Sequence, residues 1–377
     1  MSAMSSKERV LTALANAEPD RVPINYAANP GIDRRLKEHF GLKSEDHGGL
    51  LQALGVDFRG VGAPYKGPKL HADVPERGVV VDNWGIHRRW IEHGSGGYWD
   101  FCDFPLREAS AEQVAQWPLP NPDDFDYSGV AAACQANRDY AVVVGGAGHG
   151  DVINATGMVR SMEQVLVDLI TDDPAGLLLI RRRAEVLVKI TRRTIEASQG
   201  GFDVFWMGED LGTQHSPLIS LELYRRHLRP IHQMYIDLAK HFGLPVVIHT
   251  CGSSSWAYED FIEMGVTGVD TLQPEAANMS PRYLKEHFGG RLAFHGCVST
   301  AGPVSFGTVD EVIADCRETL AVMMPGGGYC FAPTHQLQDN SPTANVVAMY
   351  DTAHRYGVYG RAASRRGGTR ERGAAGR

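Results

Sequence analysis

The sequence predicts an α/β protein built on a (β/α)8 TIM barrel, with a helix before the barrel and a hairpin inserted into it. Eight short apolar segments alternate with helical patterns along the chain. Each segment passes directly into polar or glycine-rich residues, as barrel strands do where they enter the active-site loops. The first segment, residues 22–26, is followed by no glycine-rich phosphate-binding turn, which argues against an open dinucleotide-binding sheet.

The length and composition are those of an ordinary soluble enzyme. The 377 residues, 43% hydrophobic and 22% charged, can bury one large core. The six cysteines are scattered without close pairing, which fits a reducing compartment and argues against a disulfide framework. No apolar run approaches the roughly 20 residues of a membrane span, and the N-terminus lacks the apolar core of a signal peptide. We therefore expect a cytoplasmic protein.

The charge is distributed unevenly. The last seventeen residues hold six arginines and one glutamate, a net charge of +5, so residues 1–360 carry −13 of the total of −8. A strongly acidic body argues against nucleic acid as a partner. Residues 361–377 contain no apolar side chain larger than alanine, and we expect them to be a disordered basic tail. The predicted single domain is therefore the barrel over residues 1–360.

The N-terminal third contains two strands, two helices and the insertion. Residues 5–14 place apolar side chains at helical spacing behind a capping serine, so a helix opens the chain. Residues 22–26 and 55–62 predict the first two strands, and residues 31–40 predict a helix between them. Residues 79–100 break the alternation; the segments 79–85 and 86–92 predict an inserted hairpin that forms a lid or side wall.

From residue 140 onwards the alternation is regular. The predicted helices cover residues 162–170, 174–198, 221–242 and 345–356. The six remaining strands are predicted at residues 140–146, 203–210, 245–248, 268–274, 291–298 and 327–333.

The strand at residues 245–248 ends at a candidate metal site. Side chains alternate along a strand, so His249 and Cys251 leave the same face at its carboxyl end. Imidazole and thiolate are both natural Zn²⁺ ligands. A core histidine beside a small buried cysteine is the commoner reason for such a pair, so only a third ligand elsewhere makes a metal site of it.

The third ligand is predicted from the depth of the eighth strand. His335 lies just beyond that strand, whereas Cys330 is five residues earlier and so roughly 16 Å deeper at about 3.3 Å per residue. We therefore expect His249, Cys251 and His335 to hold a catalytic zinc ion with one position open. Cys330 and Cys297 remain alternatives.

Other polar residues follow the strands and predict a polar or metallic ligand. Glu209 and Asp210 are adjacent, so only one faces inward, and the alternation with Phe205 and Met207 favours Glu209. We expect Glu209 to be a general base or a fourth ligand, and His295 to be catalytic or to bind a substrate oxygen. The residues predicted to bind substrate are Asn25, Tyr26, Asp57 and Gln273.

Together these segments resemble the uroporphyrinogen decarboxylase superfamily over roughly residues 5–360, including its cobamide-dependent methyltransferase branch. The matching segments are Glu8-Arg9-Val10, Pro19-Asp20-Arg21-Val22-Pro23, Gly208-Glu209-Asp210-Leu211-Gly212, His249-Thr250-Cys251-Gly252, Gln273-Pro274-Glu275-Ala276, Phe294-His295-Gly296 and Ala332-Pro333-Thr334-His335.

The resemblance implies a zinc-dependent methyltransferase or demethylase that moves a methyl group between a small substrate and a corrinoid, such as methylcobalamin, or a thiol. Members of that branch bind zinc through His-x-Cys and a distant cysteine, and His335 stands at the distant position here. The chain has no Asp-x-His-x-x-Gly cobalamin segment, so the corrinoid is expected on a separate protein. A homodimer is a further expected association.

The alternative is decarboxylation of a small or tetrapyrrole carboxylate. Uroporphyrinogen decarboxylases proper carry an Arg-Gln-Ala-Gly-Arg-Tyr segment after the first strand, whereas residues 24–30 of this chain contain no arginine. Only Arg59 and Arg160 remain to hold substrate carboxylates. A protein that binds a ligand without chemistry is the third reading.

Overall fold

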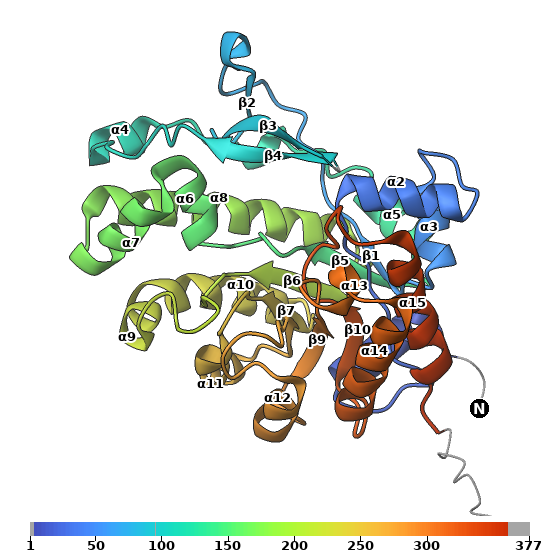
Figure 1. Cartoon of the computed structure of the whole chain (residues 1–377). Helices are drawn as coiled ribbons and strands as arrows, with labels where there is room; N and C mark the ends of the chain where they lie inside the picture. Colours follow the sequence, from blue (N-terminus) through green and yellow to red (C-terminus); the bar gives the residue numbers. More distant parts are fainter. Residues whose placement is uncertain (1–3, 95, 361–377) are drawn as a thin grey trace, which may run out of the picture.

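In the computed structural model, which describes residues 4–94 and 96–360, parallel strands form one curled sheet (Figure 1). Its seven strands follow the order β1-β5-β6-β7-β8-β9-β10. They are β1 (Phe58–Gly60), β5 (Ala141–Gly145), β6 (Val204–Gly208), β7 (Val246–His249), β8 (Gly268–Thr271), β9 (Ala293–Val298) and β10 (Tyr329–Pro333). The predicted tail at residues 361–377 lies outside the described residues.

The sheet is not the closed eight-stranded barrel that the sequence predicts. Residues 22–26 form no strand; Ile24 makes a single parallel bridge to Phe331 of β10, and its carbonyl accepts a hydrogen bond from Asp57 N at 2.9 Å. Pro23 has no N–H to donate, which limits the ladder on this segment. The first predicted strand is therefore only a bridge between the two edges of a TIM-like half-barrel.

Most predicted helices are confirmed to within about two residues. Helix α1 packs against β1, β5 and β10 at one end of the sheet, and the longer helices cover its outer side (Figure 1). The helices are α1 (Ser6–Leu14), α2 (Pro30–His39), α3 (His47–Ala53), α4 (Ala111–Gln116), α5 (Val130–Ala136), α6 (Ile153–Arg160), α7 (Met162–Thr171), α8 (Pro174–Ala197), α9 (Leu221–Leu223), α10 (Arg229–His241), α11 (Tyr258–Met264), α12 (Pro281–Phe288), α13 (Pro303–Phe306), α14 (Val309–Met323) and α15 (Thr343–Tyr356).

The helix predicted over residues 221–242 is interrupted. A π turn, Tyr224–Leu228, separates α9 from α10. Pro230 lies at the start of α10 and cannot donate a hydrogen bond to the carbonyl four residues earlier. The π turn lies just before this proline, where the regular helical hydrogen-bond pattern is interrupted.

The inserted segment is a three-stranded antiparallel sheet. Strand β2 (Val79–Val81) pairs with β3 (His87–His93), which confirms the predicted hairpin. Strand β4 (Gly96–Cys102), which the sequence analysis did not identify, pairs with β3 along its whole length. In Figure 1 this sheet lies over α6 and α8, in the position expected of a side wall.

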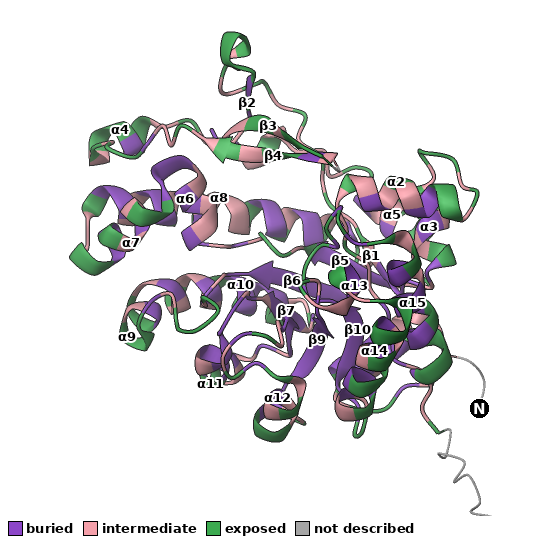
Figure 2. Ribbon diagram, in the orientation of Figure 1, coloured by how far each residue is buried: buried purple, intermediate pink, exposed green. Residues whose placement is uncertain are grey.

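Burial follows the layers of the fold. The strands of the main sheet are largely buried, and the exposed residues lie on the outer faces of the helices, in loops and on the inserted sheet (Figure 2). Every residue of β6, β8, β9 and β10 is buried, as expected for parallel strands covered on both faces. Among the described residues, none of the helices combines the length and the apolar composition that a membrane crossing needs.

Candidate metal centre

Three side chains of metal-ligand type meet where β6 and β7 end. Gly208 of β6 pairs with His249 of β7, so the residues that follow the two strands are neighbours. Ligand atoms of Asp210, His249 and Cys251 all lie within 4.8 Å of one another. Nε2 of His249 is 3.4 Å from Cys251 Sγ and 3.8 Å from Asp210 Oδ1. The side chains of His249 and Cys251 therefore lie together, as the sequence predicts, and the carboxylate of Asp210 lies beside them.

The loop that carries Cys251 is held by its neighbours. Cys251 N donates a hydrogen bond to Asp210 Oδ1 at 2.9 Å. Gly252 N donates to Gln273 Oε1 at 2.6 Å. Gln273, predicted to bind substrate, thus supports the loop after β7 in this structure. Cys251 and Asp210 are linked through this backbone bond whether or not an ion lies between them.

Asp270 orients two histidines at once. Its Oδ2 is 2.7 Å from His249 Nδ1, and its Oδ1 is 2.6 Å from His295 Nδ1. Burial opposes the charged carboxylate, but His295 and His249 hold the pKa of Asp270 well below its usual range. His249 Nδ1 also lies 2.6 Å from Thr271 Oγ1, so Nε2 is the ring nitrogen left for a metal ion, as in most metal-binding histidines. Burial opposes a charged imidazole, but Asp270 raises the pKa of His249, so a metal ion would have to displace a proton from Nε2.

His335 faces His249 across the same cavity. Their ring centroids are 6.3 Å apart, and both line a cavity of about 380 Å³. Burial and the nearby His249 lower the pKa of His335, so its neutral, ligand-competent form is favoured. His335, the predicted third ligand, is not a member of the three-residue cluster, in which Asp210 takes the third place. The alternatives Cys330 and Cys297 are each 1% exposed and also lie outside the cluster.

The cavity has polar and apolar sides. Asn25 Nδ2 lies 3.0 Å from His295 Nε2, and Asn25, Tyr26 and His295 all line the cavity. Trp206 meets the His295 ring edge-on with centroids 4.8 Å apart, and Phe58 lies at 5.8 Å. A ligand here would meet imidazole, amide and aromatic groups.

Glu209 lies elsewhere. It is fully buried, and its carboxylate accepts hydrogen bonds from Val152 N at 2.7 Å and Ile153 N at 3.0 Å, at the start of α6. Burial raises the pKa of Glu209 to about 8. Strand β6 ends at Gly208, so the alternation that favoured Glu209 does not extend to it. Asp210 is the residue that joins the cluster.

Asp57 is also placed away from the cavity. Strand β1 begins only at Phe58, so Asp57 precedes the strand instead of lying near its end. Its fully buried carboxylate pairs with Arg9 and Arg21, each at 2.7 Å. These two arginines occupy both of its oxygens, which makes Asp57 an anchor of the N-terminal segment.

Comparison with known proteins identifies the broader group. Residues 103–356 match the family model described as uroporphyrinogen decarboxylase (URO-D). No curated protein sequence matches the chain significantly. A methyltransferase from Methanosarcina mazei is among the solved structures with a similar fold, with a TM-score of 0.60 and 20% sequence identity. The similarity covers 94% of this chain and 99% of the methyltransferase. At that identity the likeness concerns the fold.

Proposed function

The chain belongs to the uroporphyrinogen decarboxylase family, and on that premise we propose a zinc-dependent methyltransferase or demethylase that moves a methyl group between a small substrate and a corrinoid or thiol. The observation that carries this proposal is the cluster of Asp210, His249 and Cys251 beside a cavity. The fold shared with a methyltransferase adds support. The corrinoid, its carrier protein, a homodimer and the cytoplasmic location rest on the sequence analysis alone.

The donor set fits zinc. Zinc accepts nitrogen, sulfur and carboxylate oxygen, and catalytic sites use three protein ligands with one position left open. Asp210, His249 and Cys251 supply one donor of each kind. His335, predicted from the sequence as the third ligand, lies outside this set but near it, with its ring centroid 6.3 Å from that of His249, and we propose it as a further nitrogen donor.

The protein side of the chemistry follows from the contacts. Zinc, when bound, would supply Lewis acidity, which lowers the pKa of a thiol or polarises a leaving oxygen. Asp270 lies 2.7 Å from His249 Nδ1, and this contact leaves Nε2 facing Cys251. His295, held by Asp270 and Asn25, presents its ring to the cavity and is proposed to position the substrate. Trp206 and Phe58 pack edge-on against His295 and supply the apolar part of the cavity wall.

The decarboxylase alternative has less support because its expected carboxylate binders are engaged elsewhere. The guanidinium of Arg59 lies 3.7 Å from the centroid of the Tyr140 ring. Arg160 pairs with Asp168 and Asp173. Neither Arg59 nor Arg160 is among the described residues that line the cavity beside His249 or the cavity of about 700 Å³ on the other side of Gly60 and Gly146.

Zinc content of the purified full-length protein tests the proposal. We expect about one zinc ion per chain, lost in Asp210→Asn, His249→Ala and Cys251→Ala. The control is Cys102→Ala, a partly exposed cysteine on β4, which should keep its zinc. The zinc-loaded protein should then transfer methyl groups between methylcobalamin and thiols. Retention of zinc in all three variants, or full activity without metal, contradicts the assignment.

A further inference from the structure

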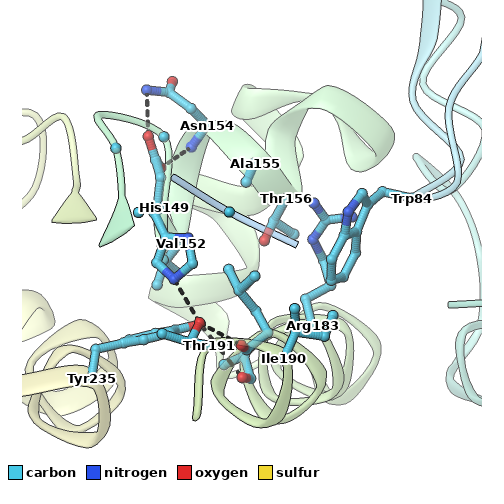
Figure 3. A pocket seen from close by; sticks show the side chains of 18 of the residues that line it. Trp84, His149, Val152, Asn154, Ala155, Thr156, Arg183, Ile190, Thr191 and Tyr235 are labelled. Atoms are coloured by element: carbon cyan, nitrogen blue, oxygen red, sulfur yellow. Dashed lines mark hydrogen bonds between the residues drawn. The ribbon is translucent and has the colours of Figure 1, made fainter. Parts of the chain in front are cut away.

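A second cavity, of about 700 Å³, lies between the loop after β5, helix α8 and the inserted sheet (Figure 3). It is distinct from the cavity that contains His249, although Gly60 and Gly146 line both. Its volume lies in the range of pockets that enclose small organic ligands. The proposed chemistry needs room for two reactants, and the fold offers two adjoining cavities.

The side chain of Asn154 connects this second cavity with the proposed metal cluster. Asn154, which lines it, donates from Nδ2 to Asp151 Oδ2 at 3.0 Å and to Asp210 Oδ2 at 2.8 Å. Asp151 also lines the cavity. One amide group therefore separates the cavity wall from a member of the metal cluster, so a ligand bound here lies next to the centre.

The wall contains an arginine without a close ion pair or hydrogen bond, although Asp82 and Asp151 act on its charge from a longer distance. Arg183 of α8 stacks on Trp84, with its guanidinium carbon 4.9 Å from the ring centroid (Figure 3). Its Nη1 is buried without a hydrogen-bond partner, and within residues 4–94 and 96–360 it forms no ion pair. Arg88, which also lines the cavity, pairs with Asp82 at 2.6 Å.

An unpaired buried cation is costly, and an anionic ligand would offset that cost. Burial lowers the pKa of Arg183 to about 10, so the guanidinium is still charged at neutral pH. A guanidinium matches the planar fork of a carboxylate. A phosphate dianion fits less well, because Arg183 is a single guanidinium and the carboxylate of Asp82 also faces the cavity.

The remaining wall suits a hydrocarbon body. Aliphatic and aromatic side chains make up much of it, namely Val144, Met158, Ile180, Leu187, Ile190 and Tyr235. His149 is engaged with Thr191 Oγ1 at 2.8 Å (Figure 3). Trp84 beside Arg183 favours a planar group near the charged end of the ligand.

We propose that this cavity binds an organic monocarboxylate, with the carboxylate on Arg183 against Trp84 and the apolar body along α8. That this carboxylate is the methyl-bearing or methyl-accepting substrate rests on the proposed function. The binding site itself does not, because Arg183 and the metal cluster are separate groups.

Calorimetric titration of the full-length protein with matched acid and amide pairs tests the site. The probes are benzoate against benzamide and 2-naphthoate against 2-naphthamide. At least one acid should bind tenfold or more tightly than its amide, a factor equal to about 1.4 kcal/mol. Arg183→Met should abolish that preference, and Arg183→Lys should keep part of it. Arg192→Met, which removes an exposed arginine of the same helix, should keep all of it.

The outcomes separate the two proposals. Arg183→Met breaks no ion pair or hydrogen bond that the described residues form, and methionine can still pack on Trp84, so the variant should melt near the wild-type temperature. His249→Ala should lose zinc while retaining the preference for the acid. If the protein binds no zinc but still prefers the acid in a manner that depends on Arg183, the carboxylate site is confirmed. Only the proposal that this carboxylate is the methyl-transfer substrate is then wrong. Equal affinity for acid and amide in every pair, or an unchanged preference in Arg183→Met, overturns the site.

Discussion

At the scale of single residues, Asp270 decides how the centre is arranged. The strand register places it between two histidines, because His249 pairs with Asp270 across β7 and β8, and Asp270 pairs with His295 across β8 and β9. One carboxylate therefore orients both rings. The sequence analysis named His249 and His295 but gave Asp270 no role, although the alignment of neighbouring parallel strands is the signal that links the three.

Asp270→Asn should weaken zinc binding by about 10- to 100-fold, the usual effect of losing a carboxylate that supports a metal-binding histidine. The amide supplies only one acceptor oxygen for two Nδ1–H groups, so the proton of His249 is no longer fixed on Nδ1. Competition with a chromophoric chelator measures the affinity. Asp310→Asn, at an exposed aspartate of α14, is the control and should bind zinc as the wild type does. Unchanged affinity in Asp270→Asn would show that His249 does not bind the metal through Nε2.

At the scale of elements, two loops hold the centre by packing backbone against backbone. A Cβ on Gly212, after β6, would lie 2.3 Å from Ser253 N. A Cβ on Gly252, after β7, would lie 2.2 Å from Gly212 O, and Gly252 has a φ of +71°. Only glycine allows so close an approach, and this contact keeps Asp210 and Cys251 together.

Gly212→Ala should therefore destabilise the protein by about 1–3 kcal/mol, the usual cost of adding an atom to a closely packed contact. It should also lower zinc affinity, because the loop after β7 must move. Gly129→Ala is the matched control, since a Cβ there meets nothing within 4 Å. Denaturant unfolding and chelator competition measure the two effects. A stable Gly212→Ala protein with wild-type zinc affinity would refute the role of this contact.

A second element-scale contact joins the loop after β5 to α8. His149, bound to Thr191, has its pKa lowered to about 4 by burial, against an ordinary value of 6.5. Between pH 6.5 and pH 4, His149 binds a proton in the unfolded chain but stays neutral in the folded protein. Stability from neutral His149 is therefore complete above pH 6.5 and is lost as the pH falls through 4.

His149→Gln should flatten the acid side of the stability profile. The loss of unfolding free energy between pH 6.5 and 4 should shrink by at most about 1.4 kcal/mol per pH unit, the value for one proton. Urea unfolding of both proteins at several pH values measures the slopes. His39→Gln, at an exposed histidine of α2, should leave the wild-type slope unchanged. Parallel profiles for His149→Gln and wild type would rule out this linkage.

The sequence predicts the direction of side chains only within a strand, and the exact residue at which a strand begins or ends is harder to predict. The pair of His249 and Cys251 was predictable because both residues follow one short strand with regular alternation. Glu209 was preferred over Asp210 because the same alternation was extended past Gly208, where the strand ends. Asp57 was misplaced for a related reason, since β1 begins only at Phe58.

At the scale of the whole molecule, the chain order of elements was predictable and the cavities were not. Apolar periodicity revealed seven of the eight predicted strands and the long helices, because each pattern lies within a short window. The pocket around Arg183 depends instead on contacts between α8 and the inserted sheet, such as Arg183 on Trp84, about 100 residues apart in the sequence. No local pattern encodes such a contact.

The metal should also stabilise the entire fold. Its proposed ligands are the last residue of β7 and residues of the loops after β6 and β7, so an ion that binds only the folded chain ties neighbouring strands together. At 100 times the dissociation constant, such binding contributes about 2.7 kcal/mol. We therefore expect added zinc to raise the melting temperature of the chelator-treated protein by a few degrees, with Cys102→Ala behaving as the wild type. His249→Ala and Asp210→Asn should melt at a temperature that does not respond to zinc. An equal zinc response in those two variants would place the ion elsewhere on the molecule, and calorimetric scanning at matched zinc concentrations distinguishes the outcomes.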